Sequence, residues 1–323
     1  MIRWTIGRLL SAATTLFGIA LLVFLCVRLM PGGYEDVVLG PLASPQQRAE
    51  IAARFGLDQP VFVQFFLWIG GLIHGDLGIS MVSQAPVTDE LSVRLPVTVL
   101  LAVMSLSITL LVGVPLGVLT AVRGGNRLDG RGGVAGRLFS AIGISLPEFV
   151  LGSVLIYVFS RYALGLQVGG FATGTAGFGA TFRALILPAL VLSLFSVAAT
   201  ARTTRDAVLD VLVEPHITAA VGRGETPWHI VRHHILRNIG VPVLTLLGSI
   251  VAYLLGGAVI VESLFNISGV GSYMVSALGR RDFGVVQATV LLTATVFVAV
   301  SLLTEIVSGL LDPRVSTTRK AAR

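Results

Sequence analysis

Six apolar runs of about the length needed to cross a bilayer constrain this chain more than any other sequence feature. They cover residues 7–30, 95–122, 138–163, 184–201, 243–261 and 283–311. About 20 predominantly apolar residues in a helix span the hydrocarbon core of a membrane. The chain is 54% hydrophobic and 12% charged, whereas soluble domains carry about 25% charged residues. The sequence therefore predicts an all-α integral membrane protein with six transmembrane helices.

The first apolar run is predicted to be an uncleaved span. A secretory signal peptide has an apolar core of about 7–15 residues before a small-residue cleavage site. This run is longer and ends in Arg28, Leu29 and Met30. Most of the 23 Lys and Arg residues lie on one side of the membrane if both termini are cytoplasmic. Because positive charge favours the cytoplasmic side, we expect an N-in, C-in topology.

Residues 33–94 are too polar to span and are expected to form an extracytoplasmic helical insertion between the first two spans. Ser44-Pro45-Gln46-Gln47 is a capping box with proline at the first helical position, which predicts a short helix ending near Gly56. A second, more apolar helix is predicted after Pro60, ending at about His74. A structural lid on the span bundle is one possible role of this segment.

Residues 202–242 form a polar stretch between the fourth and fifth spans, and the expected topology places them in the cytoplasm. This stretch holds all but one of the five histidines. It predicts one helix over 203–221, a break at Gly222-Arg223-Gly224, and a second helix. Thr226 is the expected cap of the second helix, with Pro227 at its first position. A paired-helix element between spans suits docking of another protein better than catalysis.

The sequence predicts neither a catalytic set nor a metal site. His229 and His233 have the i, i+4 spacing of one helix face, but no third ligand is evident. We interpret these histidines as polar surface or docking groups. The single cysteine, Cys26, excludes an intrachain disulfide and a cysteine metal site. The net charge of +6 is not organised into a basic face with interleaved aromatics, so no nucleic-acid partner is expected.

The sequence also lacks a nucleotide-binding loop. A P-loop ends in Lys-Ser or Lys-Thr, and the sole lysine of this chain is Lys320, which is followed by Ala321. If the chain takes part in ATP-driven transport, the ATPase must be another polypeptide. The chain itself is not expected to be an enzyme.

Ionisable side chains in or beside the spans are costly to bury and are candidate contacts of a transported solute. We single out Arg28, Glu148 and Glu262 as candidate substrate-path residues. Other roles remain open, because Arg28 could extend to the interface and Glu262 could cap the turn that follows it. A path that accepts varied side chains is expected to be wide and wet.

Short motifs in a fixed order then point to a family. Ala219-Ala220, Gly224, His234-Ile235-Leu236-Arg237-Asn238 and Pro242 resemble the coupling loop of ABC importer permeases. Thr218 stands where the general motif has Glu. The chain more narrowly resembles the inner-membrane permeases of the oligopeptide/dipeptide and nickel uptake systems. Further matching segments are Pro31-Gly32, Gly56-Leu57-Asp58-Gln59-Pro60, Gly75-Asp76-Leu77-Gly78-Ile79-Ser80, Ser145-Leu146-Pro147-Glu148-Phe149, Glu262 to Gly271 with Ser268 in place of proline, and Leu311-Asp312-Pro313-Arg314.

The resemblance implies a subunit of the bacterial inner membrane that forms half of a translocation path. Its implied partners are a second homologous permease, two ABC ATPase subunits that bind ATP and Mg²⁺, and an extracytoplasmic solute-binding protein. The insertion at 33–94 would help to form the face that meets the binding protein. The residues implied to lie at the ATPase groove are Glu214, Ala219, Ala220, Gly222, Gly224 and Arg237.

Two other classes stay open at this point. A stand-alone secondary transporter or channel would use intramembrane ion-coupling carboxylates and often broken, internally repeated helices, which are not clearly present. A membrane-embedded enzyme would need a paired nucleophile and base or metal ligands at bilayer depth. Within the family, the substrate could be a dipeptide, an oligopeptide, a nickel chelate or another small solute.

Overall fold

The computed structural model describes residues 2–29, 39–40, 43–54, 56–124, 131–162, 165–169 and 177–311. Within these ranges the chain is helical, with one isolated β-bridge between Ile79 and Pro86 and no strand. Five helical segments are long and apolar enough to cross a membrane: Ile6–Leu29, Val87–Val122, Phe178–Leu212, Pro242–Leu264 and Phe283–Val307. These segments confirm the predicted class, an all-α integral membrane protein.

Some predicted features lie wholly or partly outside the described residues. They are the Pro31-Gly32 and Leu311-Asp312-Pro313-Arg314 motifs and the arginine-rich loop between the second and third expected spans. The described chain divides into two compact units. The first unit is Met1–Val99, Phe171–Gly177 and Asn266–Val298, and the second is Leu100–Gly170, Phe178–Phe265 and Ala299–Arg323.

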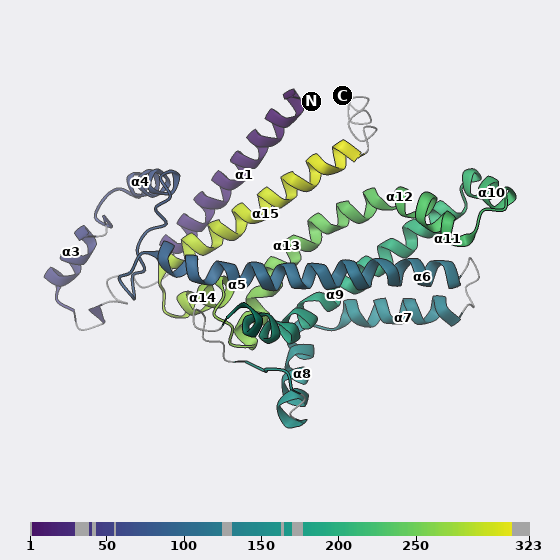
Figure 1. Ribbon diagram of the computed structural model, residues 1–323. Helices are drawn as coiled ribbons and strands as arrows, with labels where there is room; N and C mark the ends of the chain where they lie inside the picture. The colour runs from purple at the N-terminus through teal and green to yellow at the C-terminus, as the bar shows by residue number, and fades with distance from the viewer. Residues whose placement is uncertain are drawn as a thin grey trace. The chain divides into compact units, whose positions relative to one another are not determined.

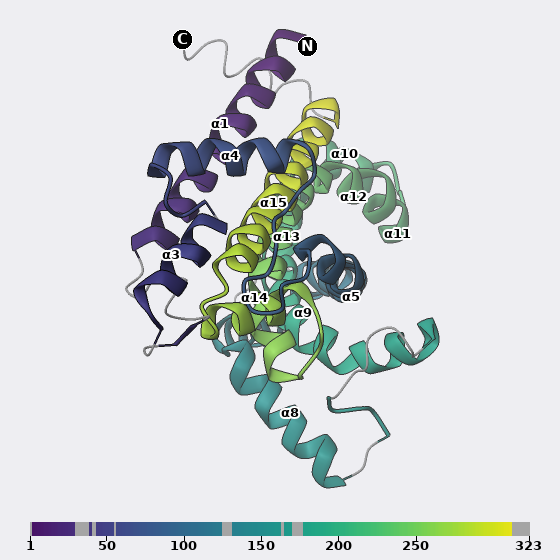
Figure 2. The same ribbon diagram turned by 90° about the vertical axis from the view of Figure 1, so that its left-hand side faces the viewer.

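The first unit contains α1 (Ile2–Leu29), α3 (Pro45–Arg54), α4 (Val61–Ile73), α14 (Val270–Gly279) and the first parts of α5 (Val87–Ile108) and α15 (Phe283–Leu311). Figure 2 shows α4 crossing α1, and aromatic rings hold the two helices together. The Phe24 ring lies 5.3 Å from that of Phe65 and 5.9 Å from that of Trp68. The expected capping box is confirmed at α3, where the Ser44 amide donates to Gln47 Oε1 at 3.0 Å and the Gln47 amide donates to Ser44 Oγ at 3.3 Å.

A buried carboxylate fastens the loop before α5 to the turn between α14 and α15. Asp282, which is 4% exposed, accepts hydrogen bonds from Ser80 Oγ at 2.5 Å, Met81 N at 2.9 Å and Val82 N at 3.3 Å. Hydrogen bonds to an ionised acceptor are stronger than those between neutral groups. Asp282 is thus a structural anchor within the first unit, and no local sequence pattern indicates this role.

The second unit is organised around α9 (Phe178–Leu212). Figure 1 shows α6 (Val114–Gly124), α7 (Arg131–Ser145) and α13 (Gly240–Leu264) running beside it. The most apolar window of α9 is 72% buried, the largest share among the five candidate spans. The short π-helical turn η1 (Thr109–Gly113) precedes α6, and both pack on α9. The second unit is therefore packed around a largely buried central helix.

The third expected span, residues 138–163, is not one continuous helix. It is divided into α7 and α8 (Glu148–Tyr162), with Leu146 and Pro147 between them. A residue before proline is sterically disfavoured in the α-helical region, so helices tend to end there. The break corrects the expectation of an uninterrupted span, and the proline in the sequence could have predicted it.

The expected helix over 203–221 is also wrong. α9 extends through the fourth expected span, 184–201, and ends only at Leu212, and α10 (Pro215–Gly222) follows a separate start. Glu214 is extended, with φ −73° and ψ 142°, as the residue before proline prefers. Pro215 occupies the first position of α10, where its missing N–H removes no helical hydrogen bond. Likewise α5 begins at Val87, within the expected 33–94 insertion.

Candidate ATPase-coupling site

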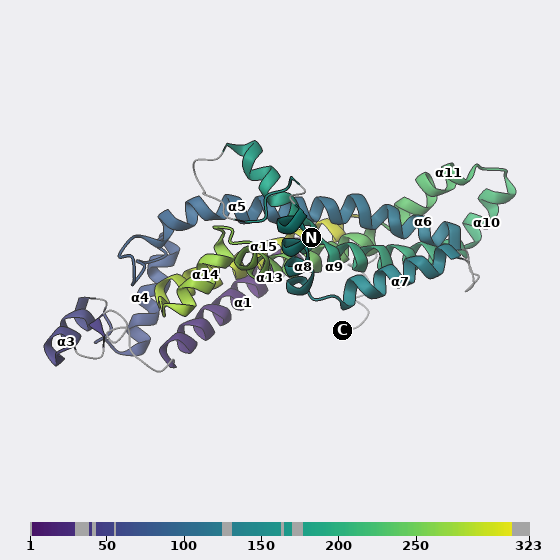
Figure 3. The ribbon, with the colours of Figure 1, turned by 90° about the horizontal axis from the view of Figure 1, so that it is seen from below.

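The polar stretch folds into a helical hairpin, defined here as residues 213–239. Its first arm is α10. Its second arm comprises α11 (Pro227–His229), the π-helical turn η2 (Ile230–Ile235) and α12 (Leu236–Asn238), and it leads into α13. Within the second unit, α10 and α11 lie at one end of the α6–α9 pair (Figure 3). The hairpin thus projects from the end of two packed helices.

The turn of the hairpin follows the predicted chemistry. Gly224 has φ +77°, a left-handed conformation that a side chain would strain. Thr226 caps α11 by accepting a hydrogen bond from the His229 amide at 3.4 Å. Pro227 occupies the first position of α11. The predicted break, cap and helix start are therefore confirmed.

The inner face of the hairpin is an apolar cluster. Ile217, Ala220, Ile230, Ile235 and Ile239 are buried together with Val208 and Val211 of α9 and Ala121 of α6. Burying one such aliphatic side chain contributes about 1.5–3 kcal/mol relative to leaving it in water. The hairpin is accordingly held in place by its own chain and forms a structured projection.

The outer face exposes apolar side chains among charged and polar ones. Val213 is 67% exposed, Val221 60% and Trp228 71%. Their neighbours include the exposed side chains of Arg223 and His229. Tryptophan is enriched among the residues that dominate binding energy at protein interfaces, so the exposed Trp228 is a candidate contact for a partner.

A carboxylate organises the polar side of the turn. Arg223 Nη2 donates to Glu225 Oε1 at 2.6 Å, and His234 Nε2 lies 3.0 Å from Glu225 Oε2. The hydrogen bond from Arg223, followed by the one from His234, holds the pKa of Glu225 below its ordinary value. Glu225 therefore stays ionised at neutral pH and connects the turn to the second arm.

The structure places most of the expected coupling residues on the surface of the hairpin. Glu214, Ala219, Gly222, Gly224 and Arg237 are exposed. Ala220 is fully buried in the apolar cluster, so it supports the hairpin and presents no atoms to a partner. Glu214 Oε2 lies 3.0 Å from His216 Nδ1 at the start of α10.

The three candidate path residues are divided between the two units. Arg28 belongs to the first unit and stacks on Phe24, with its guanidinium carbon 5.3 Å from the ring centroid. Glu148 and Glu262 belong to the second unit. Glu148 accepts a hydrogen bond from Tyr253 of α13, and Glu262 is fully buried near the end of α13.

The histidines are arranged differently from the sequence expectation. His229 and His233 do stack, at 4.1 Å between ring centroids. The cluster of potential metal ligands, however, consists of His229, Glu225 and His234 and does not include His233. Glu225 could have been found, because it lies four residues before His229. The five-residue separation of His229 and His234 fits no α-helical face.

Comparison with known proteins assigns the chain to a family. Residues 113–317 match the family described as "Binding-protein-dependent transport system inner membrane component", and residues 1–102 match its N-terminal family. The chain belongs to the inner-membrane permease components of binding-protein-dependent ABC transport systems. It is a multi-pass protein of the bacterial inner membrane. The resemblance noted in the sequence is thereby confirmed.

Its relatives are similar over nearly their full length. A Sinorhizobium fredii protein named "Probable peptide ABC transporter permease protein y4tP" is 37% identical over 312 residues, 97% of this chain and 98% of the relative. The "Glutathione transport system permease protein GsiC" of Escherichia coli K12 is 35% identical over 318 residues, 98% of this chain and 99% of the relative. The protein of that name from Salmonella choleraesuis is 35% identical over 315 residues.

Proposed function

We propose that this chain forms half of the translocation path of an ATP-driven importer, with the helical hairpin as its contact to the ATPase. In this proposal six spans cross the membrane, α7 and α8 together make the third, and both termini are cytoplasmic. Residues 33–94 form an extracytoplasmic insertion, and the hairpin lies in the cytoplasm between the fourth and fifth spans.

One observation carries the ATPase contact. The hairpin is fixed by a buried core of isoleucines, yet it leaves Val213, Val221 and Trp228 exposed beside charged groups. A rigid projection with an apolar, partly charged outer face suits a socket on another protein. Because the core continues into α9, movement of the hairpin would be transmitted directly to the helix around which the second unit packs.

The partners follow from this arrangement and from the family. A second permease would complete the path, and two ATPase subunits would bind ATP and Mg²⁺, one on each hairpin. An extracytoplasmic binding protein would deliver the solute. Closure of the ATPases on ATP would move the hairpins and rock the spans between inward-facing and outward-facing states, a rigid-body transition of a known type.

For the solute, we infer a short peptide or a peptide-like molecule. The support is the names of the relatives, one a peptide permease and others glutathione permeases. Arg28, Glu148 and Glu262 are proposed contacts of the path; Glu148 is partly exposed as a residue, whereas Glu262 is fully buried. A competition series of dipeptide, glutathione and nickel chelate in uptake assays would separate these substrates.

Co-purification tests the docking role. Trp228→Ala removes the exposed indole without touching the apolar cluster, so the permease should fold and insert normally. We expect at least a tenfold loss of ATPase co-purified from detergent, because truncating an interface tryptophan typically costs about 2 kcal/mol or more. Trp228→Phe is the matched control and should retain most of the ATPase. Unchanged co-purification and uptake in Trp228→Ala would contradict the proposal.

Reconstitution tests the energy source. In liposomes, the permease pair with both ATPases and the binding protein should import solute only with ATP and Mg²⁺. The same liposomes without ATPase, under an imposed proton or sodium gradient, should import none. Transport by the chain under an ion gradient alone would replace this proposal with a secondary transporter.

A further inference from the structure

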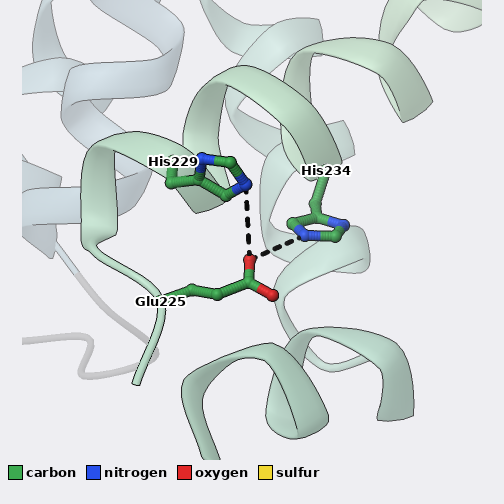
Figure 4. Close-up of side chains that lie close together, drawn as sticks. All are labelled: Glu225, His229 and His234. Atoms are coloured by element: carbon green, nitrogen blue, oxygen red, sulfur yellow. Dashed lines mark hydrogen bonds and ion pairs between the residues drawn. The ribbon is translucent and has the colours of Figure 1, made fainter. Parts of the chain in front are cut away.

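Three metal-ligating side chains meet at the turn of the hairpin. Glu225 comes from the turn itself, His229 from the end of α11 and His234 from η2 (Figure 4). Their ligand atoms all lie within 4.8 Å of one another. Glu225 Oε2 is 3.0 Å from His234 Nε2 and 3.8 Å from His229 Nε2. Both imidazoles therefore point at the same carboxylate oxygen.

The π-helical turn η2 makes this convergence possible. Its backbone hydrogen bonds join residues five apart, so residue i+5 lies near the face of residue i. His229 and His234 are five residues apart, and in an α-helix they would diverge. π-turns of this kind are frequent at functional sites. The local backbone thus builds a pair of imidazoles that α-helical spacing would separate.

A neighbouring arginine sets the orientation of the carboxylate. Arg223 donates to Glu225 Oε1 from Nη2 at 2.6 Å and from Nε at 3.1 Å. This leaves Oε2 directed at the two histidines. Outer hydrogen bonds that fix a ligating carboxylate are characteristic of protein metal sites.

The spacing of the three atoms suits a small divalent ion. Zinc binds imidazole nitrogen and carboxylate oxygen at about 2.0–2.2 Å, so neighbouring ligands of a tetrahedral ion lie about 3.3 Å apart. The two separations from Glu225 Oε2, 3.0 and 3.8 Å, lie on either side of this value. Imidazole nitrogen favours zinc and its transition-metal neighbours over calcium or magnesium, and zinc also accepts a carboxylate oxygen.

We propose that Glu225, His229 and His234 form a binding site for one divalent transition-metal ion of the zinc class. The ion takes three protein ligands and keeps at least one position for water or a further group. A further imidazole, that of His216, lies 5.9 Å from His234 between ring centroids, and its Nε2 is buried with no hydrogen-bond partner among the residues that the structure describes. The proposed site departs from the sequence-based expectation that the chain has no metal site.

Ion binding would join the turn to the second arm of the hairpin. Glu225 precedes the Thr226 cap, whereas His234 lies in η2, so one ion would cross-link the two ends of this ten-residue segment and restrict its motion. If the hairpin docks the ATPase as proposed above, occupancy by the ion would alter that contact. Binding of the ion itself does not depend on the docking role.

The test uses the full-length permease in detergent, with any polyhistidine tag removed. Co²⁺ is titrated in and followed by visible absorption, and Zn²⁺ is measured in competition with a chromogenic chelator. We expect one saturable site per chain. His229→Gln/His234→Gln and Glu225→Gln should each weaken affinity by at least tenfold, since even losing a group that only supports a ligand costs roughly 10–100-fold.

The matched control is His233→Gln. His233 stacks on His229, but its Nδ1 lies 3.3 Å from the backbone oxygen of His229 and outside the three-residue cluster. The affinity of the His233→Gln variant for Co²⁺ and Zn²⁺ should remain within about twofold of that of the unmodified chain. Absence of saturable binding, or equal losses in His233→Gln and the double variant, would overturn the proposal.

Hydrogen exchange on the unmodified chain gives a readout that needs no variant. Zn²⁺ should slow amide exchange selectively within residues 223–236, and a chelator should reverse the effect. Exchange unchanged by Zn²⁺ at a concentration that saturates the Co²⁺ signal would count against the cross-link. Because none of these measurements involves the ATPase, their failure and a failure of co-purification are distinguishable.

Discussion

Two pairs of glycines in the second unit lie in contrasting surroundings. Gly113 and Gly117 lie where η1 and α6 cross α9, and an added Cβ would come within 2.9 Å of Thr200 Cβ and 2.6 Å of Thr204 Cβ, respectively. Gly222 and Gly224 lie at the hairpin turn with nothing within 4 Å of such a Cβ. The first pair gives close helix approach, as small residues spaced by four do in membrane helices. At the turn, Gly224 allows the left-handed backbone conformation, with φ +77°, that a larger residue would adopt only with strain.

This contrast implies different consequences for the same substitution. A side chain at the α6–α9 contact must displace another helix, whereas one at the turn meets only the strain of its own backbone. Protein interiors resist added side-chain volume because they are already densely packed. Substitutions at the α6–α9 contact should therefore be more damaging than substitutions at the turn.

Gly117→Leu should be the most damaging. Its Cβ would lie 2.7 Å from the backbone oxygen of Ala201 as well as against Thr204, so α6 must move away from α9. Overpacking typically costs about 1–3 kcal/mol and occasionally more, and a clash with backbone, which cannot change rotamer, favours the upper end of that range. The measurement is the thermal midpoint in detergent. Gly18→Leu in α1, where a Cβ meets nothing within 4 Å, is the matched control and should be tolerated. Equal loss in both variants would show that crowding at the α6–α9 contact is not the cause.

Gly224→Leu should have an intermediate effect. The side chain has open space, but φ is +77°, and a non-glycine residue in this region costs about 1–2 kcal/mol. We expect a lower thermal midpoint than that of Gly222→Leu, whose position has space and an ordinary helical backbone. Gly224→Asn should recover much of the loss, because asparagine tolerates left-handed backbone better. If Gly222→Leu and Gly224→Leu behaved alike, backbone strain would not be the cause.

Thr226→Ala should have a smaller effect on the same turn. It removes the hydroxyl that accepts from the His229 amide, and loss of a helix cap typically costs about 1 kcal/mol. The hydrogen bond is long, at 3.4 Å, so the lower part of the usual range is expected. Thr226→Ser keeps the acceptor and serves as control in the same thermal assay. A loss in Thr226→Ser as large as in Thr226→Ala would exclude the cap.

The pH dependence contributed by Glu225 should be the smallest effect. Its hydrogen bond from Arg223 lowers its folded pKa from the ordinary 4.5, so its stabilising contribution is present above 4.5 and is lost as pH falls through the folded value. The thermal midpoint of the unmodified chain should therefore approach that of Glu225→Gln as pH falls from 6 to 3. A difference between the two that stays constant over this range would argue against an ionised, paired Glu225.

The sequence predicted some parts of the hairpin correctly because short-range chemistry fixes them. The residue types alone predict the roles of Gly224, Thr226 and Pro227, because backbone conformation and helix capping depend on neighbours within one turn. Pro147 and Pro215 carried equally local information about helix breaks, and the predictions of an unbroken third span and an unbroken first hairpin helix overlooked it.

The remaining features depend on contacts that the sequence does not encode locally. Asp282 accepts from Ser80, which is 202 positions away. The pairing of His229 with His234 requires a π-turn, for which α-helical periodicity gives no signal. Likewise, the local sequence does not show that Ala220 is buried whereas its neighbour Ala219 is exposed.

By itself the sequence determined the membrane class, the family and the local chemistry of the turn, because hydropathy, ordered motifs and capping are properties of neighbouring residues. The tertiary structure alone decided which side of the hairpin is core, where α9 ends, and which ligating side chains meet. Those outcomes depend on how the hairpin packs against α9 and α6, and packing is set by residues far apart in the chain.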